Sequence, residues 1–332
     1  MVILSSSHDV KNDKWIDMFA GSISGATTRM IVAPLDVIKI RLQLQKSGGS
    51  ATSTSPPQYR GVFNTLGKIT REEGIRALWK GNLSAEFLWI SYATAQFSLY
   101  NSFVHSLDQE NYLAHQNSNQ HYKPPTYISL LAGATAGSIA TAISYPFDTL
   151  RTNIVAQHQH VTIPQCVRQI YHTKGYIGFY KGITSSVLQI IPQISLQFAS
   201  YEWLKNLYIH IAIAKEQHQH AKNNNNNNNN SIRTPRELSK DPIIQLLSGG
   251  SSGAISKFIV LPFDVVKKRM QVAPGGITLK QCISDMFKNE GWRAFYKGGV
   301  PSMIKAGAAA SLSFTFYEQA KTLLTDMLFK II

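Results

Sequence analysis

The chain has 332 residues, and its 33 Lys and Arg residues outnumber its 19 Asp and Glu residues, which gives a formal net charge of +14. Only 16% of the residues are charged and 44% are hydrophobic, a balance that favours a membrane protein that meets anions. A basic nucleic-acid-binding protein would gather Lys and Arg into a stripe within a recognisable motif. No such motif occurs, so that class stays a remote alternative.

The mean hydropathy of −0.11 is low for a protein embedded in lipid. Helices that line a water-filled cavity, however, need an apolar face only toward the lipid, which keeps their average modest. Two polar tracts lower the mean further: the Ser/Thr/Pro-rich residues 47–57, and the eight consecutive Asn residues between Lys222 and Ser231. Their composition predicts disordered loop insertions.

The sequence shows no machinery for covalent or metal chemistry. It has no Gly-rich phosphate loop, nucleophile elbow or pair of catalytic carboxylates, so we expect neither an enzyme nor a bound metal or cofactor. A membrane-bound enzyme stays a second remote alternative. The two cysteines, Cys166 and Cys282, lie equally far beyond Pro146 and Pro262, and we expect them to pack rather than to form a disulfide.

In chain order, the sequence predicts a tail followed by three similar repeats. The tail, residues 1–14, has neither the apolar core of a secretory signal nor the composition of an Arg-rich transit peptide. The remaining segments are repeat 1 at 15–105, a linker at 106–125, repeat 2 at 126–211, a low-complexity linker with the poly-Asn tract at 212–241, repeat 3 at 242–325 and a C-terminal tail at 326–332.

Each repeat predicts a long helix, a short amphipathic surface helix and a second long helix. The first long helices cover 15–43, 127–155 and 243–271, and the second ones cover 82–104, 183–211 and 300–325. Each exceeds the roughly 20 residues that span a bilayer. The sequence therefore predicts six membrane-spanning helices, with both termini on one side of the membrane.

The first long helix of every repeat carries the motif Pro-x-Asp-x-x-Lys/Arg. A motif that recurs at intervals of a little over a hundred residues indicates one supersecondary unit used three times. Its prolines, Pro34, Pro146 and Pro262, predict kinks because an internal proline removes a backbone hydrogen bond. Glycines spaced as GxxxG precede each proline at 21–25, 133–137 and 249–253, and this spacing lets membrane helices approach closely.

A second motif joins each surface helix to the second long helix. It reads Glu73-Gly74 to Trp79-Lys80-Gly81 in repeat 1, Lys174-Gly175 to Tyr180-Lys181-Gly182 in repeat 2 and Glu290-Gly291 to Tyr296-Lys297-Gly298 in repeat 3. The aromatic residue and the lysine suit the depth of the membrane interface.

Both motifs, present in all three repeats, resemble those of the mitochondrial carrier family over about residues 15–324. The resemblance implies an all-α membrane protein with six transmembrane helices in a pseudo-threefold bundle, which transports its substrate by alternating access. It also implies a multi-pass, monomeric protein of the mitochondrial inner membrane. Its termini then face the intermembrane space, its basic loops face the matrix, and cardiolipin binds at the Gly74, Gly175 and Gly291 segments.

Within the family, residues 33–43, 81–97, 144–152 and 267–271 are most similar to carriers of thiamine pyrophosphate, and the poly-Asn tract favours a fungal version. This similarity implies import of thiamine pyrophosphate into the matrix in exchange for nucleotides or phosphorylated thiamine. Thiamine pyrophosphate is then the transported substrate and not a cofactor. A carrier of nucleotides or of another phosphorylated cofactor on the same fold stays the main alternative.

The charges of the proline motif imply a matrix gate. By resemblance, Asp36 pairs with Arg151, Asp148 with Lys267, and Asp264 with Lys39, because an unpaired charge in a cavity wall is costly. Gln43 and Gln271 lie nine residues after their prolines and are expected to brace two of the pairs, whereas Val155 occupies that position in repeat 2. The alternative is that these charges only hold the helices together.

A cytoplasmic gate is expected on the second long helices, in the pattern aromatic-acid-x-x-Lys. Its residues are Glu202, Lys205, Glu318 and Lys321, while repeat 1 has the uncharged residues 100–104 at that position. Only the pair between Glu202 and Lys321 can therefore form completely. We expect this gate to be weaker than the matrix gate.

The substrate contacts are expected between the gates. Two helical turns before the three aspartates lie Arg29, Thr141 and Lys257, and the two cations suit pyrophosphate because its oxygens accept charge-assisted hydrogen bonds. Snorkelling to the interface is the alternative for these cations. By resemblance, the second helices contribute Leu88, Gln189 and Lys305, and Gln193, Tyr92 and Gln96 could contact a flat heterocycle, although helix packing explains each of the latter equally well.

Overall fold

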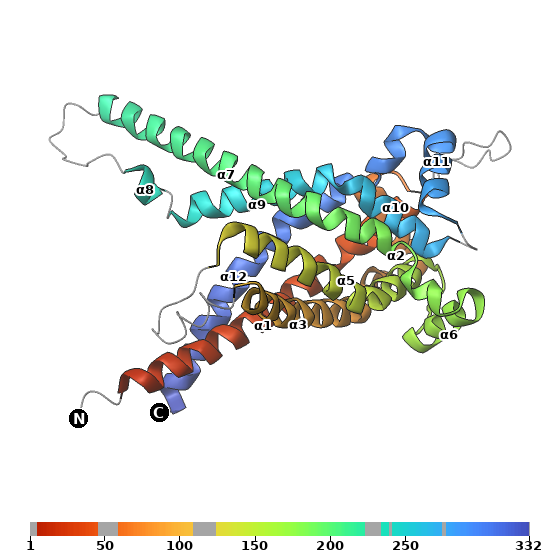
Figure 1. The fold of residues 1–332 in the computed structure, drawn as a ribbon, viewed down its shortest axis with the longest axis horizontal. Helices are drawn as coiled ribbons and strands as arrows, with labels where there is room; N and C mark the ends of the chain where they lie inside the picture. The colour runs from red at the N-terminus through yellow and green to blue at the C-terminus, as the bar shows by residue number, and fades with distance from the viewer. Residues whose placement is uncertain are drawn as a thin grey trace. The chain divides into compact units, whose positions relative to one another are not determined.

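The structure is a computed structural model that describes residues 5–45, 59–108, 124–222, 234–238, 241–273 and 277–331. These ranges contain helices and no strand (Figure 1). The predicted insertions at 47–57 and in the poly-Asn tract lie outside the described residues, as does most of the linker at 106–125.

The helices follow the predicted order of long, surface and long helix in each third. The first long helices are α1 (Ser5–Leu44), α5 (Thr126–Ala156) and the pair α9 (Pro242–Ile259) and α10 (Leu261–Val272). The surface helices are α2 (Gly61–Glu73), α6 (Ile163–Lys174) and α11 (Leu279–Glu290), followed by the short 3-10 helices η1 (Ile75–Trp79), η2 (Tyr176–Tyr180) and η3 (Trp292–Tyr296). The second long helices are α3 (Asn82–Leu107), α7 (Ile183–Lys222) and α12 (Gly299–Ile331), and a single turn, α8 (Pro235–Leu238), precedes α9.

The three motif prolines do not affect their helices equally. Pro34 and Pro146 lie inside the continuous helices α1 and α5. Pro262 instead lies in the first turn of α10, and α9 and α10 meet at an angle of 57°. A proline in the first turn of a helix removes no hydrogen bond, because the amides there have no partner within the helix.

The chain divides into two compact units, and α1, α7 and α12 each contribute residues to both. The first unit comprises Met1–Leu35, Ile194–Ile259 and Pro301–Ile332, and the second comprises Asp36–Gln193 and Val260–Val300.

In the second unit, each surface helix packs on the end of its own first long helix. One such cluster contains Ile38 and Ile69, an equivalent one contains Ile154 and Cys166, and a third contains Val265 and Cys282. Both cysteines are buried in these clusters and neither forms a disulfide, which agrees with their expected role in packing. Burial in this apolar cluster raises the pKa of the Cys166 thiol to about 11, so the thiol stays protonated at neutral pH.

Gly137 lies at a contact between helices of the second unit, where a methyl group would meet its neighbours at ordinary van der Waals distances. Along the contact between α3 and α5, a methyl group added at Gly137 would lie 3.7 Å from the Tyr92 hydroxyl and 3.9 Å from Ile190 of α7. In the first unit, the Ser24 hydroxyl of α1 donates to the Ser313 carbonyl of α12 at 2.6 Å. Both contacts are of the kind that brings membrane helices together.

Among the described residues, α5 alone is a single helix long and apolar enough to cross a membrane, and α9 with α10 passes the same test as one bent span. Large apolar side chains on α5, including Leu131, Ile139 and Ile143, are 41–56% exposed, as expected of a surface that meets lipid. The remaining long helices contain charged residues such as Arg29 and Asp36 in α1, and these charges lower their apolar character.

Candidate functional site

The motif charges form three ion pairs in the second unit. Arg151 Nη2 lies 2.6 Å from Asp36 Oδ2, and Lys39 Nζ lies 3.1 Å from Asp264 Oδ2. Lys267 Nζ lies 2.9 Å from Asp148 Oδ2. Each pair joins two different repeats, so the three pairs form a closed cycle in which every first long helix is linked to the other two. We call this cycle the motif ring.

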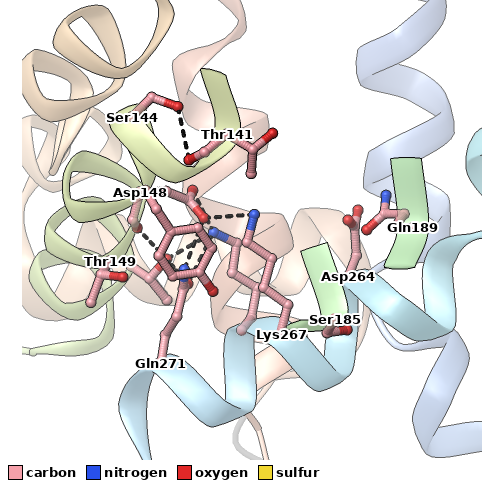
Figure 2. Close-up of polar contacts among 12 residues, drawn as sticks. Thr141, Ser144, Asp148, Thr149, Ser185, Gln189, Asp264, Lys267 and Gln271 are labelled. Carbon is pink, nitrogen blue, oxygen red and sulfur yellow. Dashed lines mark hydrogen bonds and ion pairs between the residues drawn. The ribbon is translucent and has the colours of Figure 1, made fainter. Parts of the chain in front are cut away.

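Asp148 has more partners than the sequence analysis assigned to it. Figure 2 shows Lys267 and Gln271 of α10 directed at its carboxylate. Lys268 Nζ, which sequence reasoning missed, lies 2.8 Å from Asp148 Oδ1 and also donates to the Thr152 hydroxyl at 2.8 Å. The run of three basic residues at 267–269 is the sequence feature that could have predicted a second cation beside Asp148. Ile40 and Thr152 occupy the position of Lys268 in the other two repeats, so the second cation is specific to this pair.

The two expected glutamine braces behave differently. Gln271 Nε2 donates to Asp148 Oδ2 at 2.9 Å, and its Oε1 accepts from Thr152 and Lys268, so it braces the pair of Asp148 and Lys267. Gln43 is fully buried, but neither its amide oxygen nor its amide nitrogen has a hydrogen-bond partner. The expected brace at Gln43 is therefore absent from this structure, since no acceptor or donor of the ring lies within its reach.

A second set of charges lies beside the motif ring and joins the repeats again. In repeat 1, the guanidinium of Arg41 forms a two-pronged contact with Glu73, at 2.8 and 2.9 Å, and Lys80 binds the same carboxylate. Arg41 and Lys80 also donate to the carbonyl of Gln157 in repeat 2. Burial raises the pKa of the Glu73 carboxyl, but the hydrogen bonds from Lys80 and Arg41 outweigh burial and hold that pKa below its usual value.

Repeat 3 builds the same arrangement against repeat 1. Arg269 and Lys297 both bind the Glu290 carboxylate, whose side chain is 5% exposed. Arg269 Nε donates to the Gln43 carbonyl and Lys297 Nζ donates to the Gln45 carbonyl. We call each set of an arginine, a glutamate and a lysine a clasp, because it holds the end of the next repeat's first long helix.

Repeat 2 lacks a clasp, since Asn153 and Lys174 replace the arginine and the glutamate. Lys174 Nζ instead donates to the carbonyls of Gln271 and Val272 at the end of α10, at 3.2 and 3.4 Å. Burial and the charge of nearby Lys181 lower the pKa of Lys174.

Several residues that were predicted to contact the substrate lie in the second unit and already form hydrogen bonds or ring contacts within the protein. Gln189 Nε2 donates to Gln193 Oε1 at 2.9 Å on α7, and the Thr141 hydroxyl donates back to the Gly137 carbonyl at 2.7 Å. On α3, Tyr92 meets Trp89 edge to face with ring centroids 6.3 Å apart. Leu88 and Gln96 lie half-buried on the same helix.

The predicted cationic contacts, Arg29, Lys257 and Lys305, belong to the first unit and are half-buried. The Arg29 side chain runs back along α1: a methyl group added at Gly25 would lie 3.3 Å from Arg29 Nη2. The second glycine of the GxxxG pattern therefore leaves room for the guanidinium.

The predicted cytoplasmic gate is not paired as expected. Lys321 Nζ lies 2.8 Å from Asp17 Oδ1 of α1, and the Tyr317 hydroxyl donates to the same oxygen at 2.8 Å. Among the described residues, Glu202 forms no ion pair, and Lys205 lies over the Tyr201 ring. The Glu318 side chain lies outside the described part of the structure. Asp17 was missed because repeats 2 and 3 hold no acid at that position.

Three repeats of long helices are thus tied together by a cycle of largely buried ion pairs. A family model described as "Mitochondrial carrier protein" matches residues 11–111, 122–212 and 239–328. The chain belongs to the mitochondrial carrier family.

The similar curated proteins are named as mitochondrial carriers of thiamine pyrophosphate or thiamine diphosphate. The chain is 32% identical to "Mitochondrial thiamine pyrophosphate carrier 1" of Aspergillus niger, over 93% of this chain and 92% of the relative. It is 34% identical to "Mitochondrial thiamine diphosphate carrier 1" of Arabidopsis thaliana, over 92% of each chain. Identity to the Yarrowia lipolytica protein named "Mitochondrial thiamine pyrophosphate carrier 1" is 31%, over 97% of this chain and 95% of that protein. The chain is therefore a transporter of the mitochondrial inner membrane and not an enzyme.

Proposed function

We propose that this carrier imports thiamine pyrophosphate into the mitochondrial matrix in exchange for nucleotides or phosphorylated thiamine. The motif ring is the observation that carries the proposal, since it supplies a set of breakable ion pairs that can close one side of a transport path. The names of the relatives support the choice of substrate. We further propose that the termini face the intermembrane space and that the carrier acts as a monomer.

In this proposal, the motif ring is the matrix gate. Each of its three ion pairs is largely buried, with side chains 9–17% exposed, and breaking such pairs without compensation is costly. Substrate binding offsets that cost, so transport specificity resides in the state that binds substrate most tightly. Glu202, Lys205, Glu318 and Lys321 form the opposing cytoplasmic gate, and the contact of Lys321 with Asp17 is broken when that gate closes.

Arg29, Lys257 and Lys305 are the proposed partners of the pyrophosphate. Together they supply three positive charges, which suits a substrate whose oxygens accept charge-assisted hydrogen bonds. Thr141, Gln189, Gln193, Tyr92, Gln96 and Leu88 are the proposed contacts of the organic part of the substrate. Tyr92 offers an aromatic face and the two glutamines of α7 offer donors and acceptors to a heterocycle.

Exchange in liposomes tests the proposal. The purified carrier is reconstituted into vesicles loaded with a nucleotide or with thiamine pyrophosphate, and uptake of labelled thiamine pyrophosphate is compared with uptake of nucleotides. We expect Arg29→Gln to reduce thiamine pyrophosphate uptake at least about tenfold, because a charge-assisted hydrogen bond contributes roughly 1.5–3 kcal/mol. Arg76→Gln, which changes an exposed arginine of η1, should leave uptake nearly unchanged.

The main alternative, a carrier of nucleotides or another phosphorylated cofactor, predicts a different result. Nucleotide exchange would then proceed without thiamine pyrophosphate on either side, and unlabelled thiamine pyrophosphate would not compete. That pattern would remove thiamine pyrophosphate as the substrate and leave the transport mechanism in place.

A further inference from the structure

The joint between repeat 2 and repeat 3 differs from the other two joints beside the motif ring. At the other joints a buried glutamate, Glu73 or Glu290, lies between an arginine and a lysine. At this joint the glutamate position holds Lys174 and the arginine position holds Asn153. This joint therefore lacks the carboxylate that lies at the centre of the other two clasps, and it has the cation of Lys174 at that position.

A cavity of about 430 Å³ lies at this joint. Its polar lining comes from α5, α6 and the intervening residue Gln157, and comprises Asn153, Gln157, Gln169, Thr173 and Lys174, while Val272 contributes from the end of α10. The volume falls within the range of small-molecule sites. No residue in the lining is acidic.

The charges around the cavity are unbalanced. Among the described residues, neither Lys174 nor Lys181 has a carboxylate within ion-pair distance, although Lys80 and Lys297, the counterparts of Lys181, each bind a glutamate. The charge of Lys181 and burial both act against the protonated form of Lys174. An anion beside Lys174 would relieve this repulsion and replace the missing carboxylate.

We propose that this cavity is a binding site for a small soluble anion that carries a phosphate or carboxylate group. Lys174 supplies the charge, and the amide nitrogens of Gln157 and Gln169 supply hydrogen bonds. The Asn153 amide and the Thr173 hydroxyl already donate to backbone carbonyls. The bound anion completes a third clasp and stabilises the joint between repeats 2 and 3. The site lies outside the proposed substrate contacts, and it does not depend on which substrate is carried.

Thermal unfolding of the purified full-length carrier in detergent tests this site. Inorganic phosphate is titrated at constant ionic strength against chloride, and the shift in the midpoint of unfolding gives the apparent affinity. We expect phosphate to raise the midpoint, and Lys174→Gln to weaken the phosphate response at least about tenfold, as for loss of a charge-assisted contact. Lys288→Gln, an exposed lysine on the equivalent helix α11, is the matched control and should respond like the wild type.

Lys174→Glu gives a second test. It removes the cation that donates to the Gln271 and Val272 carbonyls and places a carboxylate at the site, so the phosphate response should vanish. The double variant Arg29→Gln with Lys257→Gln should keep the Lys174-dependent response, which separates this site from the proposed substrate contacts.

Three outcomes overturn the proposal. The first is a phosphate response that is the same in Lys174→Gln and the wild type, and the second is a response lost equally in Lys288→Gln. The third is Lys174-dependent stabilisation by added cardiolipin without any by phosphate, because the ligand would then be a lipid headgroup rather than a soluble anion. None of these results bears on the substrate, which the liposome exchange tests separately.

Discussion

Asp148 has three charged or polar side-chain partners in the second unit. It lies against two lysines, Lys267 and Lys268, and accepts a further hydrogen bond from Gln271. Asp36, its counterpart in repeat 1, lies against Arg151. The negative charge at Asp148 therefore offsets two buried positive charges, which makes it the least replaceable acid of the motif ring.

Neutralising Asp148 should cost more stability than neutralising Asp36. Asp148→Asn leaves two neighbouring lysines without their carboxylate, and we expect a loss of about 3–5 kcal/mol, as for a buried ion pair that loses one partner. Asp36→Asn leaves a single unpaired arginine and should cost less. The two losses are measured as unfolding midpoints of the purified variants in detergent.

A second substitution checks the reason for this difference. Adding Lys268→Met to Asp148→Asn removes one of the two uncompensated charges and should restore part of the midpoint, whereas Lys268→Met alone should have a smaller effect. Equal losses for Asp148→Asn and Asp36→Asn, with no recovery in the double variant, would show that Lys268 does not share the Asp148 charge.

Among the elements, the clasps anchor the surface helices of repeats 1 and 3. The C-terminal end of α2 is anchored through Glu73, whose side chain is 6% exposed and is bound by Arg41 and Lys80. Its neighbour Glu72 is 49% exposed and lies 3.7 Å from Lys68 on the same helix. Two adjacent glutamates thus differ in burial and in partners, which offers a matched pair for experiment.

Glu73→Gln should lower the stability of the carrier by about 3 kcal/mol, while Glu72→Gln should change it by less than about 1 kcal/mol. The pH dependence has a definite sign, because the folded-state pKa of Glu73 lies below its ordinary value of 4.5. The stability that Glu73 contributes is therefore fully present above pH 4.5 and is lost as the pH falls through the lower, folded-state pKa. Unfolding midpoints measured from pH 7 to pH 3.5 should fall less in Glu73→Gln than in the wild type; the same fall in both would contradict this account.

At the scale of the whole molecule, the two sets of gate residues differ in the way their charges are paired. All three pairs of the motif ring are present, and the clasps of repeats 1 and 3 add further ion pairs. Lys321 contacts Asp17, and repeat 1 offers no charge to the opposing gate. We infer that the carrier without substrate favours the state in which the matrix side is closed.

Cysteine accessibility tests this inference. Cys166 and Cys282 are replaced by alanine, and a single cysteine is introduced at Thr141 or Gln189, with the lipid-facing position Leu131 as a control. In mitochondria and in inside-out inner-membrane vesicles, a membrane-impermeant thiol reagent should label the cysteine introduced at a proposed substrate contact faster from the intermembrane-space side. Faster labelling from the matrix side would reverse the inferred preference.

The class of fold follows from the sequence, since three copies of one motif, aligned on Pro34, Pro146 and Pro262, imply three equivalent units. The partners of the motif charges were expected from the resemblance to the carrier family. Most single helix ends agree with the expected ranges to within a few residues, because hydrophobic patterning and Gly-Pro punctuation are local signals. However, α1 begins at Ser5, inside the predicted N-terminal tail, and α7 and α12 continue to Lys222 and Ile331, inside the predicted linker and C-terminal tail. The tails and linkers proposed at the repeat boundaries remain predictions.

The side chains that surround the motif charges are known only from the tertiary structure. Gln43 and Gln271 are equivalent in sequence, yet one is buried without a hydrogen bond and the other binds Asp148. Lys268, Asp17 and the joint at Lys174 are likewise consequences of which side chains other repeats bring near. A repeat in the sequence fixes equivalent positions along the chain, but each position meets a different neighbouring repeat, and hydrogen bonding and burial depend on that neighbour.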